Sequence, residues 1–200
     1  RFRNLGPKSE KVDFLRGYGY QGGASRSDWT EVVAEYAYGK SFKRELLEPG
    51  SWRIGMGGFG EVLPYHENKM ILNYDKLDAY GLPTITFDAE FKENEKKMKE
   101  DWKVQAAEML EAAGCKDVQI NDSNAPIGKG IHEMGTARMG KDPKTSVLNR
   151  YNQVHAVSNV FVTDGACMTS TANQNPSLTY MALTARATNH AIEELKKMNL

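Results

Sequence analysis

The 200-residue chain carries 26 basic and 26 acidic residues, so its formal net charge at pH 7 is zero. A balanced chain has no overall field to attract nucleic acid or an anionic membrane, and we expect neither partner. No apolar run approaches the ~20 residues that a membrane-spanning helix needs. The two cysteines, Cys115 and Cys167, are too few for a disulfide framework and indicate no compartment.

The first half of the chain predicts strands separated by turns. Val12 to Tyr20 alternates loosely and is aromatic, which predicts a strand ending in a turn at Gly22-Gly23. A helix is expected from Trp29 to about Leu47, with Ser27-Asp28 as its cap. Further strands are expected over residues 52–63, 69–73 and 84–87.

Phe91 to Ala113 is the clearest helical pattern in this half, because its apolar residues recur at helical spacing and Gly114 follows. A short strand is expected from Lys116 to Ile120, before a loop that leads to His132. Several strands, then a helix, then more strands indicate an α+β fold, in which a largely antiparallel sheet carries helices on one face.

Gly55 to Gly60 spells G-x-G-x-x-G, the pattern of dinucleotide-binding turns. That motif requires a helix directly after the glycines, whose N-terminus faces the phosphates. The residues that follow include Pro64 and have no helical period, so we interpret the glycines as part of a strand. The histidines and cysteines show no metal-ligand spacing, and no metal site is expected.

Three segments in the last third of the chain form the main functional candidate. The first is His132 within a glycine-rich stretch that ends at Gly140. The second is an apolar strand pattern ending in Asp164-Gly165, and the third is Asn175-Pro176 at the start of an amphipathic helix. Asn followed by Pro predicts an N-cap and a first helical position. One face of that helix is apolar: Leu178, Met181, Ala185, Thr188, Ile192 and Leu195.

This order resembles the C-terminal end of the glucose–methanol–choline (GMC) flavin oxidoreductases. Their signature there is His-x-x-Gly-Thr-x-x-Met-Gly, then a strand ending in Asp-Gly, then an Asn-Pro or His-bearing segment before the last helix. The match is close over residues 130–195 and extends more loosely upstream to about Phe59. Within the family, the chain looks most similar to the sugar-oxidising branch of pyranose oxidase and the sugar dehydrogenases.

The resemblance implies a catalytic pair and a flavin contact. His132 would accept the hydroxyl proton of the substrate while Asn175 orients that hydroxyl, and a free imidazole titrates near pH ~6.5, which suits such a base. Asp164 and Gly165 would contact FAD on its ribityl and phosphate side. Pro176, Ser177 and Leu178 would face the N1 edge of the flavin, where a helix N-terminus favours negative charge.

The family also divides the chain and implies that much of the protein lies elsewhere. Residues 1–158 would form the substrate-binding domain, and residues 159–200 would return to the FAD-binding domain. The chain lacks an initiator Met, and we expect FAD to be held mostly by an upstream domain, so this chain alone would be colourless and inactive. The protein would pass its electrons to an external acceptor, whose identity the sequence does not predict.

The substrate is expected to be a small molecule, and a sugar is favoured. Sugar pockets need flat aromatic faces and several polar groups, and the expected sheet supplies both: Tyr18, Tyr20, Gln21, Trp52, Glu61, Tyr65 and His66. The same aromatics also suit any strand. A non-catalytic module that binds carbohydrate or a protein partner is the alternative function.

Overall fold

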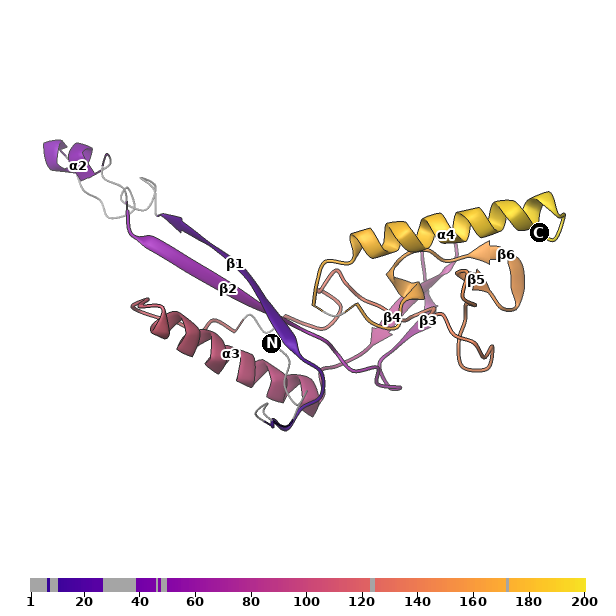
Figure 1. Ribbon diagram of the computed structural model, residues 1–200, viewed down its shortest axis with the longest axis horizontal. Coiled ribbons are helices and arrows are strands. Elements are labelled where there is room, and N and C mark those ends of the chain that lie inside the picture. The colour runs from indigo at the N-terminus through magenta and orange to yellow at the C-terminus, as the bar shows by residue number, and fades with distance from the viewer. Residues whose placement is uncertain are drawn as a thin grey trace.

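The computed structural model describes residues 7, 11–26, 39–45, 47, 50–122, 125–171 and 173–200. It contains antiparallel strands and helices, which confirms the α+β class, and Figure 1 shows their arrangement. The strands are β1 (Tyr18–Arg26), β2 (Trp52–Gly60), β3 (Lys69–Leu77), β4 (Pro83–Asp88), β5 (Gln153–Val154) and β6 (Val157–Phe161). The helical elements are α2 (Gly39–Glu45), α3 (Glu93–Ala112), the short 3-10 turn η1 (Gly165–Cys167) and α4 (Ser177–Lys196).

The strands are distributed over three two-stranded sheets in the described part of the chain: β1 with β2, β3 with β4, and β5 with β6. The predicted turn at Gly22-Gly23 is wrong, because both glycines lie inside β1. A Cβ on Gly22 would lie 2.0 Å from the carbonyl oxygen of Gly55, so glycine lets the two strands stay paired there. The predicted strand at 116–120 is also wrong, since no described strand pairs with it. Most of the helix expected from Trp29 lies outside the described residues.

The glycines of the G-x-G-x-x-G stretch lie in β2, as the strand interpretation predicted. Because these glycines have no side chains, α3 can approach the backbone of β2 closely. A Cβ on Gly58 would lie 2.8 Å from the ring of Trp102, and one on Gly60 would lie 2.6 Å from the Sδ of Met98. Both distances are too short for real side chains, so α3 packs directly on the backbone of β2.

The core of this region is aromatic and is held to α3 by hydrogen bonds. Phe14, Tyr18 and Met98 are buried together, and Trp102 packs edge-on to Tyr18 with 6.0 Å between the ring centroids. The Tyr18 hydroxyl donates to Asp101 at 2.5 Å. Burial and this hydrogen bond raise the pKa of the Tyr18 phenol well above its usual value. The phenol is therefore kept neutral in the folded protein.

That raised pKa predicts a loss of stability at alkaline pH. Because the unfolded phenol ionises first, stability is fully present below its ordinary pKa and declines as pH rises from there toward the folded pKa. We expect the melting temperature to fall above about pH 10, and to fall less in Tyr18→Phe, which has no phenol to ionise. Thermal unfolding followed by circular dichroism between about pH 8 and about pH 11 measures this. Equal slopes in the two proteins would contradict it.

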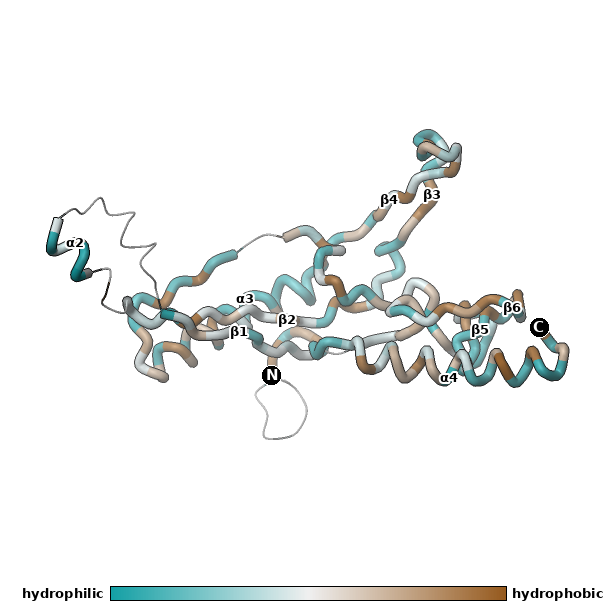
Figure 2. Tube along the Cα trace, turned by 90° about the horizontal axis from the view of Figure 1, so that it is seen from above, coloured by the Kyte–Doolittle hydropathy of each residue, from teal (hydrophilic) through white to brown (hydrophobic). Residues whose placement is uncertain are grey.

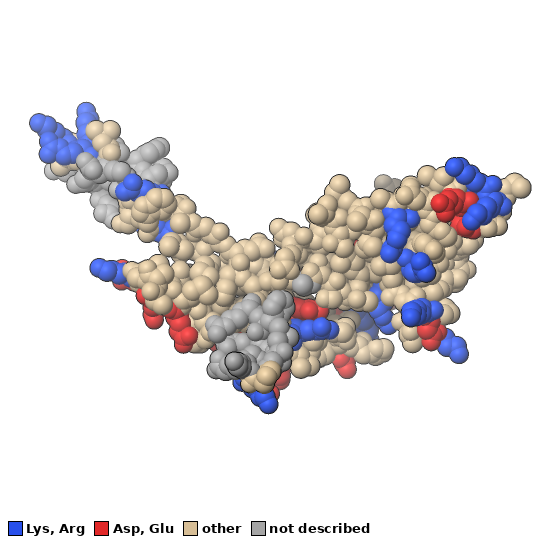
Figure 3. Space-filling model, viewed as in Figure 1, with Lys and Arg blue, Asp and Glu red and all other residues tan. Residues whose placement is uncertain are grey.

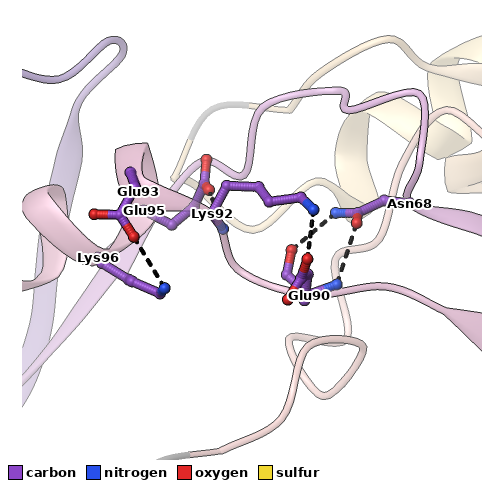
Figure 4. Close-up of polar contacts among 6 residues, drawn as sticks. All are labelled: Asn68, Glu90, Lys92, Glu93, Glu95 and Lys96. Carbon is purple, nitrogen blue, oxygen red and sulfur yellow. Dashed lines mark hydrogen bonds and ion pairs between the residues drawn. The ribbon is translucent and has the colours of Figure 1, made fainter.

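The start of α3 is tied to the chain around it by polar contacts (Figure 4). Glu95 is 8% exposed, and its carboxylate accepts hydrogen bonds from the backbone N–H groups of Leu63 and Lys92. Asn68 exchanges two hydrogen bonds of 3.1 Å with the backbone of Glu90. These contacts join the loop after β2 to the N-terminus of α3.

The chain exposes far more surface than a compact protein of its size. Its accessible surface is 15120 Å² for 22.4 kDa, whereas a compact monomer of that mass exposes roughly 9,400 Å². Figure 2 shows the β3–β4 hairpin projecting from the rest. The side chains of Tyr74 and Phe87 in this hairpin are exposed. Figure 3 shows a face on which charges of both signs are scattered around a broad uncharged area. Many large hydrophobic side chains are exposed on the described residues, and extensive exposed apolar surface is typical of chains that pack against another body.

Candidate active site

The backbone of the His132 segment is hydrogen-bonded to the turn that follows β6. Three N–H groups at alternate positions donate to three consecutive carbonyls of that turn. The bonds are Gly135 to Gly165 (3.4 Å), Ala137 to Ala166 (3.0 Å) and Met139 to Cys167 (2.9 Å). The first two segments of the functional candidate, which lie about thirty residues apart in the sequence, therefore meet directly.

Gly165 lies at the crowded centre of this junction. A Cβ there would lie 2.8 Å from the carbonyl oxygen of Glu133, 2.9 Å from the hydroxyl of Tyr180 and 3.1 Å from the Sδ of Met134. Tyr180 belongs to α4, and its hydroxyl contacts the same Met134 sulfur at 3.6 Å. All three segments of the candidate therefore converge on Gly165, and only a residue without a side chain fits.

Asp164 shapes the turn that carries Gly165. Its backbone is extended, and its Oδ1 accepts a hydrogen bond of 2.9 Å from the N–H of Ala166. The carboxylate thus acts as the cap of η1, the turn role that a strand-ending acid commonly has. β6 itself is mostly exposed, although its apolar pattern predicted burial. Its only described partner, β5, is two residues long and covers little of it.

The N-terminus of α4 differs from its prediction by one residue. Pro176, not Asn175, occupies the cap position, and the helix begins at Ser177. The cap position makes no side-chain hydrogen bond, because proline has no group that can accept one. Pro176 is buried, whereas Asn175, Ser177 and Leu178 are exposed. The first N–H groups of α4 consequently open onto an exposed face.

The catalytic candidates His132 and Asn175 belong to two of the segments that meet at the junction. His132 is half-buried at the start of the segment that binds η1, and Asn175 precedes α4. Among the described residues, neither side chain has a hydrogen-bond partner. The structure brings their two segments together through Met134, Tyr180 and Gly165.

A second set of contacts joins this site to the β1–β2 sheet. Ser170 donates a hydrogen bond of 2.7 Å to Glu61, which directly follows β2. A Cβ on Gly19 would lie 1.6 Å from the Nδ2 of Asn173, so the Asn173 amide lies against the backbone of β1. Sequence analysis missed these contacts, because partners separated by more than a hundred residues leave no local pattern.

Three tyrosines expected to line a sugar pocket are directed toward α3 instead. Tyr18 binds Asp101, Tyr20 donates to the carbonyl of Trp102 at 2.7 Å, and Tyr65 lies 3.3 Å from Glu95. These three phenols hydrogen-bond to α3 and hold it on the sheet. The three tyrosines are therefore removed from the expected sugar contacts. Gln21, Trp52 and His66 remain exposed.

Two hollows on the surface lie away from this junction. One is bounded by residues 12–14 and α3, and the other by residues 89–91, Lys99 and residues 125–127. No three metal-binding side chains gather within the described residues. Among the helices described, none has the length and apolar character needed to cross a bilayer.

Comparisons with known proteins show which family the chain belongs to. Residues 64–184 match the family model described as GMC oxidoreductase. The chain is 34% identical over 182 residues to the 2-methyl-1,2-propanediol dehydrogenase of Mycolicibacterium austroafricanum, covering 87% of this chain and 32% of that protein. It is 27% identical over 198 residues to the fructose dehydrogenase large subunit of Gluconobacter japonicus, covering 98% and 35%.

A third relative is the paromamine 6'-oxidase of Streptomyces fradiae, which is 37% identical over 79 residues, or 40% of this chain and 14% of that protein. The chain thus spans about a third of the length of the first two relatives. These relatives are dehydrogenases and oxidases of alcohols or sugars by name. Because the family model covers more than half of its residues, the chain belongs to the GMC oxidoreductase family.

Proposed function

We propose that this chain supplies the substrate-binding and catalytic residues of an FAD-dependent oxidoreductase that oxidises a CH–OH group of a sugar. The observation that carries the proposal is the junction at Gly165. There the His132 segment, the Asp164 turn and the start of α4 meet, and His132 and Asn175 keep unpaired polar side chains among the described residues. A module that only binds carbohydrate has no need of this combination.

The residues at the junction suit a flavin. Bound FAD would supply the acceptor for the hydride that leaves the substrate carbon. The open N-terminus of α4 offers backbone N–H groups and the positive end of the helix dipole, which favours an anionic or carbonyl edge by ~0.3–2 kcal/mol. Pro176, Ser177 and Leu178 would face that edge. Asp164 and Gly165 would lie along the ribityl side, where a residue without a side chain allows close approach.

His132 and Asn175 would divide the work on the substrate hydroxyl. The imidazole of His132 would accept the hydroxyl proton as the hydride departs, and positioned acid–base groups typically contribute ~10²–10⁴ in rate. The amide of Asn175 would hold the oxygen in place by a hydrogen bond. Both side chains are attached to segments fixed by backbone hydrogen bonds or by a helix, so their orientation relative to the turn is limited.

The open surface of the chain supports the proposed division into residues 1–158 and 159–200. The apolar face of α4 that was identified in the sequence points away from the described residues: Leu178 and Met181 are 79% and 68% exposed, and Leu195 is 62% exposed. The opposite face packs inward through Thr184 and Ala187. An FAD-binding domain would cover this outer face, as the second body that the large accessible surface calls for.

The substrate assignment is tested by flavin reduction in the full-length enzyme. Monosaccharides and glycosides should bleach the flavin rapidly, whereas primary aliphatic alcohols, aromatic alcohols and 1,2-diols should bleach it slowly. The diols belong in the panel because one relative is a diol dehydrogenase by name. Fast reduction by alcohols or diols and none by sugars would reject the sugar and leave the His132 mechanism standing. A full-length protein that binds no flavin would reject the proposed function itself.

A further inference from the structure

The chain that enters the turn carrying Asp164 and Gly165 is held by Asn152, which lies in the loop before β5. Asn152 is completely buried, and its φ of +64° lies in the left-handed region that asparagine tolerates better than most residues. Its Nδ2 donates to the carbonyl of Val162 at 2.9 Å, and its own carbonyl accepts from the N–H of Val162 at 2.9 Å. Val162 precedes Asp164 by two residues, so Asn152 fixes the chain as it enters the turn.

The far end of the turn is bound to the His132 segment. Cys167, the last residue of η1, is completely buried, and this burial raises the pKa of its thiol. The carbonyl of Cys167 accepts the hydrogen bond from Met139 in the His132 segment. The chain is therefore held before Asp164 by Asn152 and after Gly165 by Met139.

Arg186 connects the Asn152 amide to α4. Its Nη2 donates to the Oδ1 of Asn152 at 3.2 Å and also contacts the Sδ of Met139 at 3.5 Å. One guanidinium thus touches the loop that holds the turn and the segment that carries His132. Figure 1 shows α4 lying beside β5 and β6, as this contact requires. A hydrogen bond from a charged donor is stronger and shorter than one between neutral groups.

From this network we infer that Asn152 and Arg186 are positioning residues: they fix the Asp164–Cys167 turn relative to the His132 segment and α4. They touch neither substrate nor flavin in the proposed function, on which the inference rests. They act through Asp164, Gly165 and the backbone that leads from His132. Losing either residue shifts the surface that FAD would contact while leaving His132 and Asn175 in the chain.

The test compares two arginines in the full-length protein. Arg186→Gln removes the charge and the hydrogen bond to Asn152, and Arg186 is exposed enough for the variant to fold. Arg150→Gln is the matched control: it removes an equal charge from the loop that carries Asn152, but Arg150 lies over the ring of Tyr151, 4.9 Å from its centroid. Arg186→Lys keeps a charged donor and should restore part of the effect.

Three readouts separate positioning from a general loss of stability: the FAD dissociation constant, the visible spectrum of the bound flavin and amide hydrogen exchange over residues 133–139 and 162–168. In Arg186→Gln we expect the dissociation constant to rise about tenfold, the flavin spectrum to shift and exchange in both segments to quicken. Arg150→Gln should change none of them. Equal exchange in the two variants overturns the inference whether or not FAD binds. Faster exchange in Arg186→Gln alone, in a protein that binds no FAD, keeps the inference and rejects the proposed function.

Asn152 is tested by exchanging its amide for a carboxylate of the same shape, a change that adds one negative charge here and in the control alike. Asn152→Asp replaces the donor to the Val162 carbonyl by an oxygen, and it should weaken FAD binding at least as much as Arg186→Gln does. Asn149→Asp is its control, because Asn149 hydrogen-bonds within the same loop, to the backbone N–H groups of Tyr151 and Gln153, and contacts neither Val162 nor Arg186. Equal effects of the two asparagine variants on the flavin spectrum would contradict a role for Asn152 in positioning.

Discussion

In the full-length enzyme, His132→Ala should slow reduction of the flavin by its substrate by ~10²–10⁴-fold while FAD stays bound. The reason is that the imidazole would take the hydroxyl proton, and no other described side chain at the junction is a comparable base at neutral pH. His132 hydrogen-bonds to no described residue, so its removal breaks no hydrogen bond among them. Stopped-flow reduction at saturating substrate and the ratio of FAD to protein measure the two effects.

His155→Ala is the matched control, because His155 lies outside the junction, where its Nε2 is 3.1 Å from the Ser146 hydroxyl. Its reduction rate should equal that of the parent. Asn175→Ala should lose less rate than His132→Ala, since an amide orients the hydroxyl without accepting its proton. Its melting temperature should be unchanged, because Pro176 and not Asn175 stands at the cap of α4. Reduction of His132→Ala at the parent rate would make His132 a structural residue.

Gly165→Ala should be the most damaging single-methyl change in the site. The new Cβ would lie 2.8 Å from a backbone carbonyl and 2.9 Å from the Tyr180 hydroxyl, and overpacking of this kind typically destabilises a protein by ~1–3 kcal/mol. Because the turn would contact FAD, flavin content should fall together with stability. Denaturant unfolding and absorbance at the flavin maximum measure both.

The control for Gly165→Ala is Gly23→Ala, which adds the same methyl group where nothing lies within 4 Å of the added Cβ. That substitution should change stability by less than ~0.5 kcal/mol, as surface changes usually do. If the two alanine variants unfold at the same denaturant concentration, then the α4 and His132 segments are not packed around Gly165 as described.

The sequence predicted the site better than the surroundings that hold it. His132, Asp164-Gly165 and the helix after Asn175 were found as local patterns; the structure joins the first two segments by backbone hydrogen bonds, and α4 contacts them through the side chain of Tyr180. The single-residue error at Pro176 arose because Asn-Pro fits two neighbouring cap positions, and helix ends vary by one or two residues between assignments.

Longer-range features were beyond a local pattern. Gly22-Gly23 reads as a turn until the opposing Gly55 is known, because the close approach of two strands depends on both of them. The tyrosines of β1 have the chemistry of sugar contacts, and only the position of α3 directs them to Asp101 and Trp102. Asn152 carries no signal in the sequence, since its importance comes from burial and from side-chain partners on two other segments.

The contact of Asn173 with Gly19 also has a consequence for the order of events during synthesis. The β1–β2 sheet emerges from the ribosome before α3, which can pack on it after about forty more residues. The segment before α4 reaches the same sheet only through partners such as Ser170 and Glu61, which are 109 positions apart. Closing so large a loop is slow compared with local contacts. The β1–β2 sheet therefore stays partly uncovered until the chain has been synthesised past residue 173. Only then can the site be completed.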